Sequence, residues 1–170
     1  AEVRKVEVLK AQGYNAVRCS HNLPTEAFLN ACDSLGMLVI DEVFDQWEEP
    51  KRSNDYSQYF ARDYMKDMAL MVRRDRNHPS IIMWSIGNEI AQRADIPRGK
   101  EIALNLNLAV NENDHTRPTT MAINSFWDRP QFTWERTATV HSTTLRWEAI
   151  TMSGSIMRPT MIHYRVALCM

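Results

Sequence analysis

The chain has 170 residues, about one domain's length and short of the roughly 250 residues of a closed barrel of eight βα units. Its formal net charge is -1, from 20 Lys and Arg against 21 Asp and Glu, and 44% of its residues are apolar. These values exclude a strongly basic nucleic-acid-binding protein and a disordered chain, so we expect no nucleic-acid partner.

No run of about 18 apolar residues occurs, so the sequence predicts neither a membrane span nor a membrane partner. The charged N-terminal segment 1–10 lacks the apolar stretch of a secretion signal. Cys19, Cys32 and Cys169 form an odd count without CxxC spacing, which indicates neither a disulfide framework nor a zinc site. We therefore expect a soluble protein, with the choice between cytoplasm and periplasm left open.

Four short apolar runs predict strands that are buried on both faces of a parallel sheet, because each run is continuous rather than alternating. They are Asn15 to Cys19, Met37 to Ile40, Ile81 to Ile86, and Thr119 to Ile123. Helical patterns lie before and between them, at Val3 to Gln12, Thr25 to Leu35, Tyr56 to Arg74, and Ile102 to Val110. The third of these predicts one buried stripe, formed by Phe60, Tyr64, Met68, Met71 and Val72. The last segment also alternates as a strand would, and we predict a helix there.

This order of elements predicts an α/β fold, either a doubly wound sheet or a barrel. In both folds the catalytic groups project from the carboxyl ends of the strands. No glycine-rich phosphate loop follows any strand, which argues against a nucleotide-binding domain and against a nucleotide cofactor.

Polar residues gather where the predicted strands end. They are Arg18, His21 and Asn22 at the first strand, Asp41, Glu42, Asp45 and Trp47 at the second, and Asn88 and Glu89 at the third. Structural roles are also open to them, since His21 fits a hydrogen-bonded structural residue and Asp41 and Glu42 fit ion-pair partners of Arg18.

Glu89 is the strongest catalytic candidate, because a buried strand delivers its carboxyl group into the cavity at the top of the fold. Apolar neighbours such as Trp84 would desolvate it and favour its neutral form, as a general acid requires. Two carboxyl groups that flank a bond, one acid and one nucleophile, define a glycosidase. Trp47 and Trp127 would then supply flat faces on which sugar rings stack.

Three stretches closely resemble glycoside hydrolase family 2, the group of β-galactosidases, β-glucuronidases and β-mannosidases. They are NAVRCSHN (15–22), GMLVIDE (36–42) and DRNHPSIIMWSIGNE (75–89), the last of which resembles the family's acid/base signature. The resemblance covers roughly residues 1–136 in the family's order and spacing. It implies a fragment of a (β/α)8 TIM barrel that holds about its second to fifth strands, with the first strand and the sandwich domains upstream.

The resemblance also implies roles for single residues. Glu89 would be the acid/base of a retaining, double-displacement mechanism, and Asn88 would bond the 2-hydroxyl of the sugar. Arg18, His21, Asn22, Asp41 and Glu42 match positions that shape the pocket or hold the catalytic carboxylates. The Glu-x-His metal-binding pair of many bacterial β-galactosidases is missing at Asp45-Gln46-Trp47, so we expect no metal site.

The family's nucleophile is a glutamate in a Gly-Thr-Glu-Ser-like motif, which this chain lacks. The tail, residues 137–170, contains Glu148 as its single acidic residue and has no Asn, Gln, Lys or Asp. Read in a shifted frame, the codons permitted for residues 147–154 give Gly-Gly-Tyr-Asn-Tyr-Glu-Trp, which resembles the family's next segment. We therefore interpret the chain as a partial glycosidase barrel, 1–136, followed by a frameshifted tail, 137–170, with a natural divergent tail as the alternative.

The sequence thus predicts a retaining exo-β-glycosidase fragment that acts on carbohydrate, most similar to β-galactosidases and inactive by itself for want of the nucleophile. β-Glucuronidase or β-mannosidase specificity is the near alternative. A sugar-binding remnant without catalysis is the second class.

Overall fold

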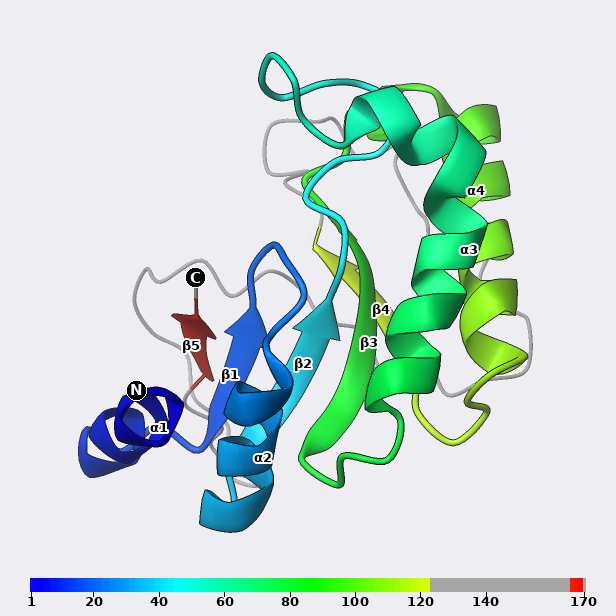
Figure 1. Ribbon diagram of the computed structural model, residues 1–170. Coiled ribbons are helices and arrows are strands. Elements are labelled where there is room, and N and C mark those ends of the chain that lie inside the picture. Colours follow the sequence, from blue (N-terminus) through cyan, green and yellow to red (C-terminus); the bar gives the residue numbers. More distant parts are fainter. Residues whose placement is uncertain (123–165, 170) are drawn as a thin grey trace, which may run out of the picture.

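The computed structural model describes residues 1–122 and 166–169, which form a five-stranded parallel sheet flanked by helices (Figure 1). In chain order the elements are α1 (Glu2–Ala11), β1 (Ala16–Cys19), α2 (Glu26–Leu35), β2 (Leu38–Glu42), α3 (Ser57–Asp75), β3 (Ile81–Asn88), the 3-10 helix η1 (Ala91–Ala94), α4 (Ile96–Asn111), β4 (Thr119–Ala122) and β5 (Val166–Cys169).

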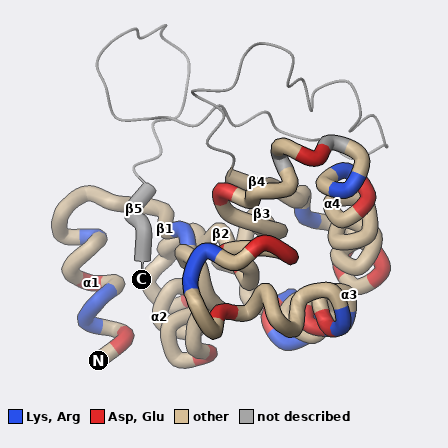
Figure 2. Tube along the Cα trace, turned by 90° about the horizontal axis from the view of Figure 1, so that it is seen from above, with Lys and Arg blue, Asp and Glu red and all other residues tan. Residues whose placement is uncertain are grey.

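The strands lie in the order β4-β3-β2-β1-β5, so the first four are neighbours in chain order. Right-handed connections between successive parallel strands place all their helices on one face of the sheet. Figure 2 shows α1 to α4 along one side of the strands, with α1 packed on α2 and α3 on α4. A doubly wound sheet reverses its strand order and carries helices on both faces, so this arrangement is that of a barrel fragment.

The predicted α/β order is confirmed for the four helices and four strands that the sequence predicted, whereas η1 and β5 were not predicted. The ambiguous segment is helical, and its helix, α4, is longer than predicted: Asp95 caps its start by accepting from the Arg98 amide at 3.2 Å. The fourth predicted strand corresponds to β4, which ends at Ala122. Of the tail, residues 137–165 and 170 lie outside the described residues, and β5 pairs in parallel with β1. The boundary at residue 136 stays a prediction.

The helix boundaries follow from local chemistry. The side chain of Thr25 accepts from the Phe28 amide at 3.2 Å and caps α2, and Gly36 ends the helix in the left-handed conformation, with φ of 68°. The end of α2 at Gly36 lets the chain reverse directly into β2, which pairs with β1 from Leu38 onward.

The hydrophobic core lies between the sheet and the helices. The predicted stripe of α3 is buried at Phe60, Met68, Met71 and Val72, while Tyr64 is half-buried and stacks on Phe60 with ring centroids 4.9 Å apart. This core fixes the strands, and therefore fixes the side chains at their carboxyl ends. No helix in the described part of the chain is both long and apolar enough to cross a membrane.

Candidate active site

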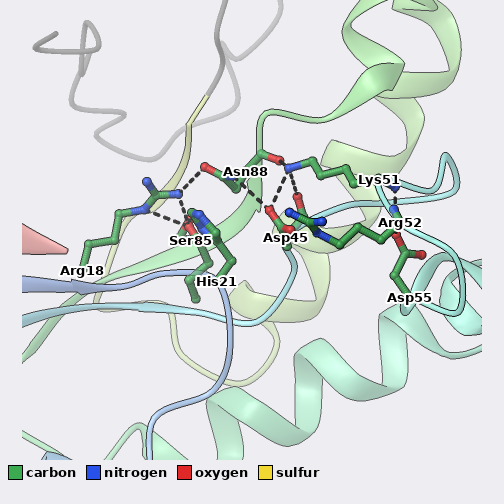
Figure 3. A network of polar contacts seen from close by, with 9 residues as sticks. Arg18, His21, Asp45, Lys51, Arg52, Asp55, Ser85 and Asn88 are labelled. Carbon is green, nitrogen blue, oxygen red and sulfur yellow. Dashed lines mark hydrogen bonds and ion pairs between the residues drawn. The ribbon is translucent and has the colours of Figure 1, made fainter. Parts of the chain in front are cut away.

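Glu42, at the end of β2, is the centre of a polar network that joins three strands. Figure 3 shows its partners Arg18, His21 and Ser85. Its carboxylate is fully buried and accepts from Arg18 Nε at 2.9 Å, from Arg18 Nη2 at 2.5 Å, and from the hydroxyl of Ser85. His21 Nδ1 lies 2.6 Å from its other oxygen. A buried carboxylate is tolerated when it is paired and hydrogen-bonded in this way. Both oxygens of Glu42 are thus engaged in holding neighbouring side chains.

Asn88 is aimed into the same network by an irregularity in β3. The side chains of Ser85 and Asn88 are three residues apart and would point to opposite faces of a regular strand. The register of β3 against β4 shifts between them, which turns Asn88 toward Arg18. Its side-chain oxygen accepts from Arg18 Nη2 at 2.9 Å, and its amide nitrogen donates to Asp45 at 3.1 Å. Donor and acceptor partners on both sides fix the orientation of the amide.

Glu89 follows β3 directly, and its backbone N–H donates to the carbonyl of Ala122 at 2.8 Å. Its side chain is exposed, so the expectation that apolar residues such as Trp84 enclose it is wrong. Trp84 is fully buried in the core cluster, where its indole N–H donates to Asp114 at 3.0 Å. Side chains alternate along β3, so Trp84 points to the helix-facing side of the sheet and does not cover Glu89 at the strand end.

His21 and Asn22 follow β1, and the structure places them differently. His21 is partly exposed, and because Nδ1 faces Glu42 its Nε2 lies on the opposite side of the ring, available to a ligand. Asn22 is exposed and lines a shallow surface pocket together with Ser20 and Thr25. No hydrogen bond among the described residues ties it to the network around Glu42.

Asp41 and Trp47, which the sequence analysis expected at the site, are both fully buried. Asp41 is adjacent to Glu42 in β2 and therefore points to the opposite, helix-facing side, where it is fully buried. Burial, together with the nearby carboxyl group of Asp75, raises its pKa well above the usual range. Trp47 is also fully buried: its indole N–H donates to the carbonyl of Ile86 at 2.9 Å, so it packs the core and offers no stacking face.

Two residues of the site escaped the sequence analysis. Ser85 could have been found, because it is a polar residue within an apolar strand, on the face that Glu42 also occupies. Lys51 gave no signal, since it lies in a loop nine residues beyond the end of β2, yet its ammonium group reaches Asp45 and Asn88 (Figure 3). Trp127 lies outside the described residues.

The described residues contain no cluster of three or more His, Cys, Asp or Glu arranged to hold a metal ion. The arrangement that they do contain is an exposed carboxyl group next to a fixed amide, a half-exposed imidazole and a guanidinium group. Such polar groups at the carboxyl ends of parallel strands define a piece of a (β/α)8-barrel enzyme.

The family is shown by comparison with known proteins. The model of "Glycosyl hydrolases family 2, TIM barrel domain" matches residues 2–149, and the chain therefore belongs to this family. It is a fragment of the catalytic TIM barrel of a glycoside hydrolase.

The relatives that match this chain are named for different glycosidase activities. The chain is 41% identical to "Beta-galactosidase BoGH2A" of Bacteroides ovatus over 109 residues, which are 64% of this chain and 13% of that protein. It is 46% identical to a "Putative beta-glucuronidase" of Formosa agariphila over 86 residues, which are 50% of this chain and 8% of that protein. The chain thus spans a small part of the length of these relatives.

Solved structures of family members align with the same fold. A family 2 glycosyl hydrolase from Bacteroides cellulosilyticus is 53% identical with a TM-score of 0.69, and the alignment covers 75% of this chain and 16% of that one. A β-glucuronidase of an uncultured Clostridium species is 27% identical with a TM-score of 0.61, covering 72% of this chain and 22% of that one.

Proposed function

We propose that this chain carries the acid/base half of the catalytic site of a retaining exo-β-glycosidase with β-galactosidase-like specificity. The observation that carries the proposal is the Asn88–Glu89 pair at the end of β3, with the amide of Asn88 fixed by Arg18 and Asp45 and the carboxyl group of Glu89 left accessible. Family membership supports the reaction class.

Glu89 is the carboxyl group that suits proton transfer. Glu42 has both oxygens occupied by Arg18, His21 and Ser85, so it lacks an oxygen that is available to a substrate. Glu89 is exposed and sits on backbone that β4 anchors, which leaves its carboxyl group accessible to a glycosidic oxygen. It would protonate the leaving oxygen in the first step and activate water in the second.

The network would recognise the sugar. Asn88 would bond the 2-hydroxyl, a contact that strengthens in the oxocarbenium-like transition state. His21 would present Nε2 to a second hydroxyl, since Glu42 holds its other nitrogen. Arg18 would act by fixing both Glu42 and Asn88.

A retaining mechanism also needs a nucleophilic carboxylate about 5 to 5.5 Å from the acid/base. The family's nucleophile motif does not occur in this sequence, so we propose that the 170-residue chain hydrolyses glycosides at a negligible rate. The assay is turnover of nitrophenyl β-galactoside by the purified chain. Turnover that disappears in Glu89→Gln would contradict the proposed inactivity.

The catalytic role requires the remaining strands. We therefore define the chimera as the full-length Bacteroides ovatus β-galactosidase with residues 1–122 of this chain in place of its own matching segment. Glu89→Gln in the chimera should lower kcat/KM about 10²- to 10⁴-fold, the contribution of a general acid/base. Glu112→Gln, at an exposed position after α4, is the matched control and should keep the activity of the unsubstituted chimera.

The leaving group separates an acid from a merely structural glutamate. Aryl galactosides with acidic phenols need little protonation, so Glu89→Gln should affect them less than substrates with alkyl leaving groups. An equal loss on both substrate types would argue against the acid role. Comparison of nitrophenyl β-galactoside, β-glucuronide and β-mannoside on the unsubstituted chimera tests specificity, and preference for either of the latter two would replace the galactoside assignment.

A further inference from the structure

The peptide group between Asn88 and Glu89 is held at both ends by elements on opposite sides. Its N–H, from Glu89, donates to the carbonyl of Ala122 in β4 at 2.8 Å. Its carbonyl, from Asn88, accepts from Nζ of Lys51 at 2.8 Å. The backbone that leads into the proposed acid/base is therefore clamped between β4 and the loop after β2. Figure 3 shows the Lys51 side of this clamp.

All three hydrogen-bond donors of the Lys51 ammonium group are engaged near this clamp. An ammonium group has three donors and no acceptor. Nζ of Lys51 donates to the backbone carbonyl of Asp45 at 2.7 Å, to its carboxylate at 2.7 Å, and to the carbonyl of Asn88. With three oxygens for three hydrogens, the group has no donor left for a substrate, and its action on the site runs through Asn88 and Glu89.

Asp45 connects the two halves of the clamp. The same carboxylate oxygen accepts from Lys51 and, at 3.1 Å, from the side chain of Asn88. Partial burial acts to raise the pKa of Asp45, but the hydrogen bonds from Lys51 and Asn88 outweigh it and hold the pKa below the usual range. The carboxylate therefore stays charged, and it fixes the backbone and the side chain of the Asn88 region together.

The loop that carries Lys51 is itself anchored. One oxygen of Asp55 accepts from the backbone N–H groups of Lys51 at 2.8 Å and Arg52 at 2.9 Å, and the other accepts from that of Ser57 at 3.0 Å. Ser57 is the first residue of α3, so Asp55 ties the loop to a helix of the core. The ammonium group thus extends from a defined backbone.

Glu89 itself shows why a clamp is needed. Its φ is 45°, in the left-handed region that a non-glycine residue adopts only at an energetic cost of about 1 to 2 kcal/mol. Such a conformation persists where surrounding contacts hold it. Here those contacts are the two hydrogen bonds to the preceding peptide group.

We propose that Lys51, acting with Asp45, is a positioning residue that holds the Asn88–Glu89 peptide so that the Glu89 carboxyl group meets the glycosidic oxygen. This inference rests on the proposed function of Glu89. It assigns to the loop after β2 a part in catalysis that Lys51 exerts through the carbonyl of Asn88.

Kinetics of Lys51→Met in the chimera are the primary test. Misplacement of the acid/base should lower kcat about 10²-fold while KM changes less than about threefold, because the sugar contact proposed for His21 and the hold of Arg18 on the Asn88 side chain persist. Lys51→Arg should recover part of kcat, since a guanidinium group reaches some of the same acceptors. Lys66→Met, at an exposed position of α3, is the matched control and should leave both constants unchanged.

The activities of Lys51→Met and Glu89→Gln together distinguish failure of the positioning role from failure of the proposed function. A full kcat in Lys51→Met, alongside a large loss in Glu89→Gln, overturns the positioning role and leaves the proposed function intact. Full activity in Glu89→Gln overturns the proposed function itself. Should Lys51→Met not fold, as judged by circular dichroism, Asp45→Asn replaces it, and there an unchanged kcat contradicts the proposal, while a loss of about tenfold supports it.

The 170-residue chain itself offers a readout that is independent of activity. Hydrogen exchange at the Glu89 amide should accelerate at least about tenfold in Lys51→Met relative to Lys66→Met, because one end of the peptide group is released. Equal protection in the two variants would contradict the clamp.

Discussion

Arg18 and Asn88 lie 70 positions apart in the sequence and share a hydrogen bond of 2.9 Å between the guanidinium group and the side-chain carbonyl. The same Nη2 atom donates to Glu42 at 2.5 Å. One arginine on β1 therefore both neutralises the buried carboxylate of β2 and orients the amide of β3.

Arg18→Met should destabilise the fold, because it leaves Glu42 fully buried without its cation. Breaking a buried pair from one side costs about 3 to 5 kcal/mol of unfolding free energy. Urea denaturation of the 170-residue chain at neutral pH measures the loss. Arg62→Met is the control, since Arg62 pairs with Asp63 at the surface, and it should have no measurable effect. Equal stability of the two variants would show that Glu42 is solvated.

Gly87→Ala should disturb the packing beneath the site. A Cβ at this position would lie 2.8 Å from the indole nitrogen of Trp47 and 3.2 Å from a side-chain carbon of Ile90. Overpacking of this kind costs about 1 to 3 kcal/mol, and it should weaken the hydrogen bond between Trp47 and Ile86, with a change in near-ultraviolet circular dichroism.

The control for this change is Gly36→Ala. The nearest atom to a Cβ there is 4.0 Å away, but φ is 68°, so only the backbone conformation resists substitution, at about 1 kcal/mol. Gly36→Ala should leave the tryptophan signal unchanged. A near-ultraviolet spectrum of Gly87→Ala that matches the wild type would contradict the predicted clash.

Asp41→Asn should flatten the dependence of stability on pH. Burial, and then the carboxyl group of Asp75, raise the pKa of Asp41 in the folded state, while Arg74 opposes the shift. The folded state therefore holds a proton that the unfolded state releases near pH 4. The stability that this proton contributes is complete below that pH and is lost as the pH rises through the raised pKa.

Urea denaturation between pH 5 and pH 8 tests this relation. The unfolding free energy of Asp41→Asn minus that of the wild type should increase with pH. Asp63→Asn is the control: its surface pairing with Arg62 lowers the pKa of Asp63, so this group is ionised in both states above pH 5 and should leave the slope unchanged. If the unfolding free energy of Asp41→Asn changes with pH as steeply as that of the wild type, Asp41 does not hold a proton in the folded state.

Local patterns were sufficient to predict α1 to α4 and β1 to β4, whereas β5 was not predicted. Continuous apolar runs gave the strands, and the spacing of Phe60, Met68 and Met71 gave the buried stripe of α3. Strand ends were placed less well, because β2 and β3 continue into polar residues that the tertiary network satisfies, as Glu42 and Asn88 show. A polar residue in the sequence predicts the end of a strand. The strand continues where a side chain on a neighbouring strand forms a hydrogen bond with that polar residue.

By itself the sequence determined the α/β class and the position of Glu89 at a strand end, because these depend on periodicity and on residues adjacent in the chain. The family came from the resemblance of three stretches to known glycoside hydrolases. Only the tertiary structure decided which polar residues share a side of the sheet. The side-chain alternation of β2 separates Asp41 from Glu42, and the register shift of β3 turns Asn88 toward Arg18. Lys51 entered the site in the same way, since a loop residue acquires its partners through the packing of elements that are distant in sequence.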